Sequence, residues 1–202
     1  MPGLALAFLV LYAVLALGLR AVVQLQRTGS TGVIGISGRP GSTEWIAGVL
    51  FEVAIGVVVI GAVLELTDVL DPISGLGTGS VRAAGIVLAL AGLAVTLGAQ
   101  WSMGDSWRVG VDPAERTELV THGPFSVVRN PIYAGVIPFF AGIALLVPNL
   151  VAIGGFALLV AGLEAQTRLV EEPYLRQVHG SAYADYAARV GRFVPGLGRL
   201  RR

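Results

Sequence analysis

Long apolar stretches separated by short polar segments dominate this chain. A helix needs about 20 mostly apolar residues to cross the hydrocarbon core of a bilayer. Three stretches reach that length, and two shorter ones, joined by a Pro-Asn turn, follow a polar segment. The five stretches cover residues 4–25, 45–66, 81–101, 132–147 and 150–163. The pattern predicts an all-α integral membrane protein with about five transmembrane helices, the last two forming a helical hairpin.

The composition supports this interpretation. Hydrophobic residues make up 54% of the 202 residues and charged residues 13%, and the mean hydropathy is +0.76. A soluble domain carries about 25% charged residues, so the surplus apolar surface must face lipid. The absence of cysteine excludes disulfides, thiolate metal sites and cysteine nucleophiles, and no metal site is expected. The charges do not form one basic face, so no nucleic-acid partner is predicted.

Arginine placement predicts the orientation, because basic residues concentrate in the cytoplasmic segments of membrane proteins. Arginines lie after the first apolar stretch, between the third and fourth, and throughout the tail. The loop after the second stretch carries Asp68 and Asp71 and no arginine before Arg82. We therefore expect the N-terminus outside and the C-terminus in the cytoplasm of a bacterial inner membrane. Because no basic residue precedes Arg20, the first stretch is expected to be an uncleaved span.

The segment at residues 118–133 contains several structural signals. Gly123-Pro124 indicates a turn. Asn130 and Pro131 suit the start of a helix, since asparagine is a favoured N-cap and proline at the first helical position loses no needed hydrogen bond. With Arg129 beside it, the positive end of this helix would form an anion site. Alternatively, Arg129 is only a basic membrane anchor, which is common at such positions.

A second polar cluster lies where the last apolar stretch ends. Glu164, Arg168 and Glu172 are spaced four residues apart and share one helix face. Glu171 is the neighbour of Glu172. The cluster either forms a site or marks the place where the helix reaches water. Apolar residues then recur at helical spacing through residues 175–190, which predicts an amphipathic cytoplasmic helix lying at the membrane interface.

These motifs resemble the isoprenylcysteine carboxyl methyltransferase family, whose bacterial members look similar to phospholipid methyltransferases. The first match is Gly123-Pro124-Phe125, where the family has Gly-Pro-Tyr. The second is residues 128–133, where the family has Arg-His-Pro-x-Tyr. The third match comprises Glu171, Glu172, Leu175, Gly180, Tyr183, Tyr186, Val190 and Pro195. The ordered combination, which covers roughly residues 95–197, is more specific than any single motif.

The resemblance implies S-adenosyl-L-methionine as methyl donor. The acceptor is expected to be a lipophilic small molecule or a lipidated substrate, and membrane lipids are expected partners. Carried over by position, the cofactor-binding residues would be Glu118, Leu119, Val120, Phe125, Arg129, Asn130, Pro131, Ile132, Tyr133 and Glu171. The catalytic residues would be Arg168, which would hold the acceptor, and Glu172, which would accept a proton from an amine acceptor. Residues 1–80 would supply two N-terminal spans, and residues 81–202 the methyltransferase core.

Two positions depart from the family pattern. Asn130 replaces a histidine, so this position can donate a hydrogen bond but cannot carry a charge. Phe125 replaces a tyrosine and keeps only its stacking surface. A carboxylate acceptor needs no general base, because an arginine can hold it bidentately. The resemblance and this chemistry favour O-methylation of a carboxylate.

Two other functions are compatible with the sequence. Sterol reductases look similar around Arg-x-Pro-x-Tyr, which would indicate an NADPH-dependent lipid reductase. A small transporter or scaffold is the second alternative, although transporter sites lie near the middle of the membrane. Glu52 lies within the second span. Because a charge there costs at least ~2.5–3.5 kcal/mol on insertion scales, Glu52 is expected to face the bundle interior.

Overall fold

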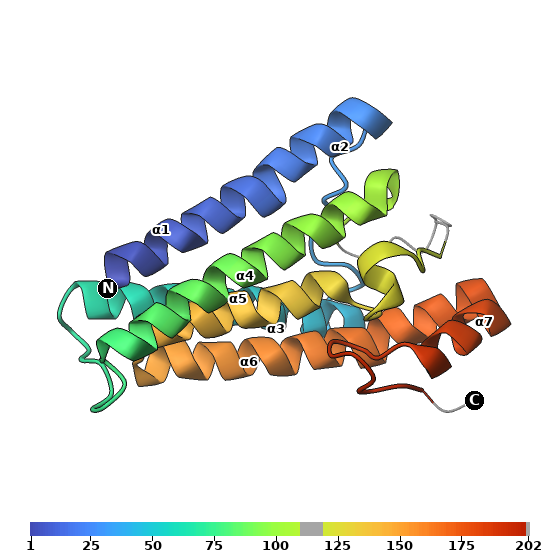
Figure 1. The fold of residues 1–202 in the computed structure, drawn as a ribbon. Helices are drawn as coiled ribbons and strands as arrows, with labels where there is room; N and C mark the ends of the chain where they lie inside the picture. The colour runs from blue at the N-terminus through green and yellow to red at the C-terminus, as the bar shows by residue number, and fades with distance from the viewer. Residues whose placement is uncertain (110–118, 201–202) are drawn as a thin grey trace.

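The computed structural model describes residues 1–109 and 119–200, which fold into a bundle of long helices (Figure 1). The first helix leans away from the others at its C-terminal half, and α7 lies at the end of the bundle near the C-terminus. In chain order the elements are α1 (Pro2–Tyr12), η1 (Ala13–Leu19), α2 (Arg20–Thr28), α3 (Thr43–Leu66), α4 (Gly79–Met103), η2 (Gly104–Ser106), η3 (Gly123–Ser126), α5 (Pro131–Leu146), α6 (Leu150–Gln166), η4 (Thr167–Glu171) and α7 (Glu172–Arg189).

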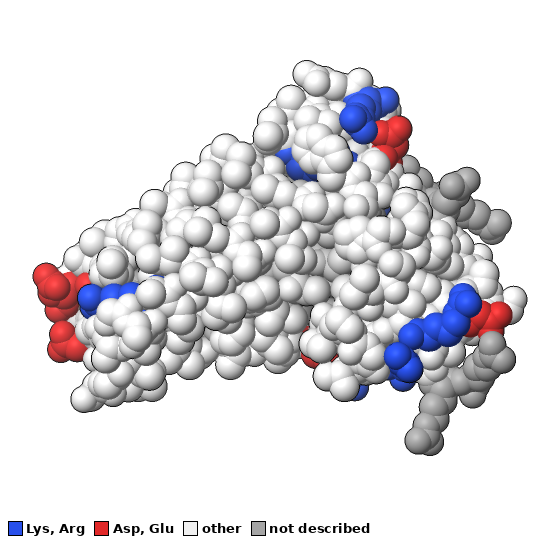
Figure 2. Space-filling model, viewed as in Figure 1, with Lys and Arg blue, Asp and Glu red and all other residues white. Residues whose placement is uncertain are grey.

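Four helices are long and apolar enough to cross a membrane: the continuous helix made by α1, η1 and α2, then α3, α4 and the helix that begins with α6. α5 is apolar but shorter, with 16 residues, or about 24 Å at 1.5 Å per residue. On the face shown in Figure 2, most charged side chains lie toward the two ends of the molecule, and the broad surface between them is almost entirely uncharged. The chain is an integral membrane protein, and the predicted all-α fold is confirmed.

The turn between α5 and α6 is built around Asn149, as the Pro-Asn pair predicts. Asn149 Oδ1 accepts a hydrogen bond from Ala152 N at 2.9 Å, which caps the start of α6. Its Nδ2 donates to Gly61 O and to Glu65 Oε2, both at 3.0 Å. One buried side chain therefore starts α6 and joins it to the last turns of α3.

Glycines bring α4 and α5 into backbone contact. A Cβ atom added to Gly92 would lie 2.5 Å from Gly135 O, and one added to Gly142 would lie 2.5 Å from Gly85 O. Small residues allow this close approach between membrane helices. The contact fixes the position of α5, whose first turn carries several of the predicted site residues.

The last helix differs from the expected hairpin arm followed by a separate interfacial helix. α6 continues through the π-helical turn η4 into α7, and the helix runs without a break from Leu150 until Gly180, whose backbone (φ 55°, ψ −126°) is not helical and bends the chain. At 1.5 Å per residue, residues 150–179 extend about 45 Å, more than the hydrocarbon thickness of about 30 Å. Pro173 accounts for part of the irregularity, because it has no N–H to donate within the helix. The end of this helix therefore projects beyond the membrane.

The apolar side of α7 is covered by the chain itself, which corrects the expectation that this helix would lie free on the membrane. Tyr183, Tyr186 and Ala187 are buried, and Leu119 and Leu200 pack against them. Ala182, one of the apolar residues at helical spacing within residues 175–190, is exposed. The helical spacing thus predicted some of the buried residues of this face. Spacing alone does not tell whether lipid or another segment of the same protein covers the face.

Polar side chains of the first helix hold the end of α4. Arg20 donates to Gly104 O, and its Cζ lies 4.7 Å from the ring centre of Trp107. Gln24 Nε2 donates to Asp105 O at 2.6 Å. Arg20, Gln24 and Trp107 are all buried. The segment that leads from α4 toward the predicted site is thus anchored to the first membrane helix.

Glu52 lies on the exposed side of α3, so its expected interior position is wrong. Ala47, Ala54 and Val58 are the buried residues of this part of the helix. They are seven and four residues apart and therefore share one helix face. Glu52 falls on the opposite face of the helix. The spacing of the small apolar residues therefore predicts the position of Glu52 better than the cost of inserting a charge does.

Candidate active site

The C-terminal tail runs beside the segment that precedes α5. Arg129 N donates to Gly191 O at 2.8 Å, and Asn130 N donates to Arg192 O at 3.0 Å. Pro131 then occupies the first turn of α5, as predicted. These backbone contacts make the tail part of the framework that positions the first turn of α5.

Asn130 occupies the N-cap position of α5, but its side chain makes no capping hydrogen bond, contrary to the prediction. Its backbone has φ −124° and ψ 67°, whereas a capping residue normally has extended backbone. Its Nδ2 donates to Arg192 O at 3.4 Å instead. The tail therefore orients this side chain, and a role for Asn130 in cofactor binding stays a prediction.

Arg129 is enclosed by α7 and the tail, with 2% of its side chain exposed. Its Nη1 donates to Ala187 O at 3.1 Å and to Val190 O at 2.5 Å. Its Nη2 donates to Glu172 Oε1 at 2.7 Å and to Gly198 O at 3.1 Å. Arg129 therefore forms neither the open anion site nor the membrane anchor that the sequence suggested. Its hydrogen bonds hold α7 and the tail against the start of α5.

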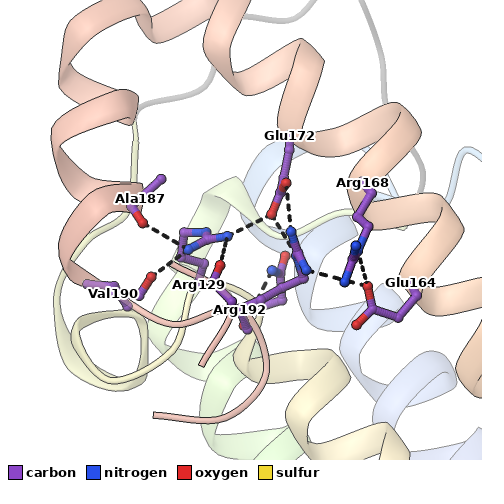
Figure 3. A network of polar contacts seen from close by, with 9 residues as sticks. Arg129, Glu164, Arg168, Glu172, Ala187, Val190 and Arg192 are labelled. Carbon is purple, nitrogen blue, oxygen red and sulfur yellow. Dashed lines mark hydrogen bonds and ion pairs between the residues drawn. The ribbon is translucent and has the colours of Figure 1, made fainter. Parts of the chain in front are cut away.

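Glu172 lies at the centre of a buried ion network (Figure 3). Besides Arg129, its oxygens accept hydrogen bonds from Arg192 Nε at 2.8 Å and Arg192 Nη2 at 3.1 Å. The hydrogen bond to Glu172 raises the pKa of the Arg192 guanidinium against the opposing effect of burial. A carboxylate with guanidinium donors on both oxygens is a poor proton acceptor. This geometry does not support the predicted catalytic role of Glu172 and indicates a positioning role instead.

The predicted pairing on one helix face is present between Glu164 and Arg168. Arg168 Nε donates to Glu164 Oε2 at 2.5 Å, and Arg192 Nη1 lies 3.5 Å from the same oxygen. Arg168 is 58% exposed. Together with Glu164, Ala165 and Leu169 it lines an open hollow of about 460 Å³. Arg168 is therefore the accessible member of the predicted catalytic pair.

Tyr133 and Glu171, both predicted to bind cofactor, meet although they are 38 residues apart. Tyr133 Oη donates a hydrogen bond to Glu171 Oε1 at 2.5 Å. Thr167 is fully buried. Within η4, Glu172 N donates to Thr167 O, a π-helical pattern that is often found at functional sites. The structure thus joins the first turn of α5 to the end of the last membrane helix.

The remaining predicted cofactor residues differ in their surroundings. Phe125 is buried, and its carbonyl oxygen accepts a hydrogen bond from α7 at 2.6 Å. Ile132 packs against the core of the membrane helices, whereas Leu119 packs against α7. Val120 is half-buried, and Glu118 lies outside the described residues. Their contact with a cofactor stays a prediction.

Comparison with known proteins covers the region that carries most of these residues. The model of the family described as phospholipid methyltransferase matches residues 81–182, half of the chain. The chain belongs to the phospholipid methyltransferase family. The family match includes Tyr133, Arg168, Glu171 and Glu172 and ends before Arg192.

The chain is similar in sequence to two plant isoprenylcysteine methyltransferases. Protein-S-isoprenylcysteine O-methyltransferase B of Arabidopsis thaliana is 35% identical over 81 residues, which are 40% of this chain and 41% of that protein. Protein-S-isoprenylcysteine O-methyltransferase A of the same plant is 30% identical over 113 residues, which are 55% and 57% of the two chains. The matches thus span about half the length of these two relatives.

A solved structure shows the same fold over nearly the whole chain. The eukaryotic intramembrane Ras methyltransferase, an isoprenylcysteine carboxyl methyltransferase, superposes with a TM-score of 0.68 over 98% of this chain and 67% of that chain. The sequence identity is 21%, so this likeness concerns the fold alone. The shared fold includes the N-terminal helices, which the family model does not cover.

Three residues of the site were absent from the predicted set. Thr167 lies four residues before Glu171, so helical spacing could have pointed to it, and Gln166 is its neighbour. Arg192 carries no such signal, because it is one of many arginines in the tail. Its contact with Glu172 arises only when the tail folds back beside α5, outside the region matched to the phospholipid methyltransferase family.

Proposed function

We propose that this chain transfers the methyl group of S-adenosyl-L-methionine to the carboxylate of a lipophilic acceptor in the membrane. The contact between Tyr133 and Glu171 carries the proposal, because it joins two distant motifs within the family-matched region. The relatives named above are O-methyltransferases of protein S-isoprenylcysteine. A prenylated cysteine or another lipid-linked carboxylate is accordingly the proposed acceptor.

The residues around Glu171 fit the cofactor chemically. Gln166 Oε1 and Thr167 Oγ1 are buried and have no hydrogen-bond partner within residues 1–109 and 119–200. Buried polar atoms normally have partners, and these oxygens, with the Glu171 carboxylate, suit the amino and hydroxyl groups of S-adenosylmethionine. When bound, this cofactor supplies a methyl group on a sulfonium that is already activated for transfer. Glu171, Gln166 and Thr167 would hold it.

The residues of the chain would mainly bind, orient and exclude water. A carboxylate acceptor is already nucleophilic, so no residue needs to remove a proton from it. Arg168 is accessible and carries the charge that would hold such a group. Both oxygens of Glu172 are occupied by arginines, which leaves an amine acceptor without its predicted base. This supports O-methylation over N-methylation, with the acceptor aligned by binding rather than by acid–base chemistry.

Glu171→Gln is expected to weaken S-adenosylmethionine binding roughly 10- to 150-fold, the equivalent of losing one charge-assisted hydrogen bond of about 1.5–3 kcal/mol. Calorimetry on the purified protein in detergent measures this affinity. A screen with tritiated methyl donor over lipid extracts then identifies the methylated product.

Glu52→Gln is the matched control, because it makes the same change on the exposed side of α3; it should keep the affinity within twofold. Equal affinities for wild type and Glu171→Gln would remove Glu171 from the site. Binding of NADPH with no binding of S-adenosylmethionine would contradict the proposed function and favour a lipid reductase.

The proposed orientation places the N-terminus outside and the C-terminus, with the site, in the cytoplasm. Its basis is the arginine distribution of the sequence. Reporter enzymes that are active on opposite sides of a bacterial inner membrane, fused to each terminus, should give opposite signals. The same signal from both termini would contradict an odd number of spans. A cytoplasmic signal from the N-terminus with an outside signal from the C-terminus would show that the orientation is the reverse of the proposed one.

A further inference from the structure

Arg20, at the start of α2 on the first membrane helix, is a buried cation with 5% of its surface exposed. Its Nη2 donates to the carbonyl oxygen of Gly104, whereas Nε and Nη1 have no hydrogen-bond partner among residues 1–109 and 119–200. Within the same residues Arg20 has no ion-pair partner, and the carboxylate of Asp105 pairs with Arg27 at 3.7 Å. Buried charges in proteins are normally paired. The guanidinium of Arg20 therefore calls for an anion from outside the described chain.

Arg20 lies at the depth where lipid head groups are found. From Pro2 to Arg20 the continuous first helix rises about 27 Å at 1.5 Å per residue, close to the hydrocarbon thickness of about 30 Å. Gly104, which Arg20 contacts, directly follows the end of α4. Trp101, in the last turn of α4, is exposed, as is typical of tryptophan at a membrane–water interface. The unpaired guanidinium thus lies near the membrane surface, on the side proposed to be cytoplasmic.

A small pocket lies beside Arg20, between α2 and the end of α4. Its volume is about 10 Å³, which is close to the space that one water-sized oxygen atom needs. Residues 20, 23 and 27 have the spacing of a single helix face. The arginines at positions 20 and 27 outnumber Asp105, which leaves one positive charge in excess. The lining residues are Arg20, Val23, Arg27, Trp101 and Gly104.

We propose that this pocket binds the phosphate group of an anionic phospholipid. Arg20 would hold one phosphate oxygen in the pocket, and Arg27, which is 52% exposed, would contact the group from the water side. Basic pockets between membrane helices on the cytoplasmic side are suited to lipid head groups. Leu17, one turn before Arg20, is an exposed apolar residue and would contact an acyl chain. A lipid therefore matches this surface better than a free phosphate ion does.

This lipid site is separate from the proposed methyl transfer. In Figure 1, α4 and α5 lie between α2 and α7, so the lipid would not contact the groups around Glu171. Its phosphate would neutralise Arg20 at the point where the first helix holds the end of α4. The inference therefore concerns a lipid that stabilises the bundle, and it does not depend on which molecule accepts the methyl group.

The alternative is that Arg20 is only a structural residue whose remaining nitrogens meet water. Its hydrogen bond to Gly104 and its contact with the ring of Trp107, 4.7 Å from the ring centre, hold the end of α4 in either case. Both interpretations predict a loss of stability when Arg20 is replaced. They differ in the effect of lipid, because a ligand that binds only the folded state stabilises it in proportion to its binding.

The test measures the binding of phosphatidylglycerol and of phosphatidylcholine with the same acyl chains to the full chain in detergent, by native mass spectrometry. Both lipids carry a phosphate, but choline adds a positive charge that the excess charge of the pocket repels. The wild type should bind phosphatidylglycerol at least fivefold more tightly. Arg20→Gln should reduce this preference to less than twofold. Arg27→Gln, at an exposed arginine that does not hold α4, should at least halve it.

Arg39→Gln is the matched control, because it removes an exposed arginine from the loop that follows the same helix; it should keep the preference of the wild type. Equal binding of the two lipids by the wild type would overturn the proposal. An unchanged preference in Arg20→Gln or in Arg27→Gln would overturn it as well. An equal loss in Arg39→Gln would show unspecific attraction between charges in place of a site.

Thermal unfolding in the same detergent separates a lipid site from a structural arginine and from a site for soluble phosphate. Phosphatidylglycerol should raise the unfolding midpoint of the wild type and of Arg39→Gln, and leave that of Arg20→Gln unchanged. An equal rise in Arg20→Gln would contradict the site. Excess inorganic phosphate, at matched ionic strength, should not displace the lipid, and displacement would assign the pocket to a soluble phosphate instead. None of these measurements requires S-adenosylmethionine, so they stand or fall independently of the proposed function.

Discussion

Glu172→Ala is expected to lower the free energy of unfolding by about 3–5 kcal/mol, the usual cost of removing one partner from a buried ion pair. The carboxylate is the only group that separates Arg129 from Arg192 in the chain of ion pairs among the described residues. Without it, Arg129 remains buried with its charge uncompensated, and Arg192 keeps only its 3.5 Å contact with Glu164. Unfolding by sodium dodecyl sulfate in mixed micelles, followed by circular dichroism, measures the loss.

Arg168→Ala is the matched control, because it removes a charge from the exposed end of the same ion chain. A surface pair contributes about 0–1 kcal/mol, so this variant should unfold close to wild type. Glu172→Gln should fall between the two, since it keeps the shape and loses the charge. If Glu172→Ala were as stable as Arg168→Ala, the buried network would not hold the tail as described.

The same network explains why stability and site geometry are linked in this protein. Arg129 belongs to the segment before α5, Glu172 to the last helix and Arg192 to the tail. Their ion pairs hold three segments that are far apart in sequence at the point where Tyr133 meets Glu171. Loss of Glu172 should therefore weaken cofactor binding as well, and more strongly than loss of Arg168, although Glu172 would act without touching the cofactor.

The features that follow local rules could be predicted from the sequence. The length of the apolar stretches predicted the membrane helices, Pro131 predicted the start of α5, and the pair Pro148-Asn149 predicted the turn between α5 and α6. The meeting of Tyr133 with Glu171 was implied by the family resemblance, which assigned both to one site. The helices and turns depend on interactions between residues close in the sequence. The contact between Tyr133 and Glu171 is between distant residues, and it could be anticipated only because a family with the same motifs places both residues in one site.

The features that depend on how distant segments pack could not be predicted in this way. Arg129 at a helix start suggests an anion site until the tail is known to cover it. Arg192 has no local pattern, because its partner Glu172 lies on another segment. The side chain of Asn130 turns to the tail instead of capping α5, since Arg192 O offers an acceptor. All three depend on the fold-back of residues 190–200.

Gly92→Leu is expected to be the most damaging substitution in the membrane bundle. A side chain there would enter the backbone of α5, because even a Cβ would lie 2.5 Å from Gly135 O and 2.8 Å from Phe139 Cα. Backbone atoms cannot give way as flexible side chains do, so the two helices would have to separate. Overpacking costs typically about 1–3 kcal/mol and occasionally more, and we expect at least the upper end here. The displaced α5 would also move Tyr133 away from Glu171.

Gly98→Leu is the control on the same helix, since a Cβ at that position meets nothing within 4 Å. It should unfold within about 0.5 kcal/mol of wild type, as surface substitutions usually do. Both variants replace a helical glycine by leucine, so helix propensity changes equally and only the packing differs. Unfolding in mixed micelles and S-adenosylmethionine affinity should both fall for Gly92→Leu alone. Similar behaviour of the two variants would mean that α4 and α5 do not meet through Gly92.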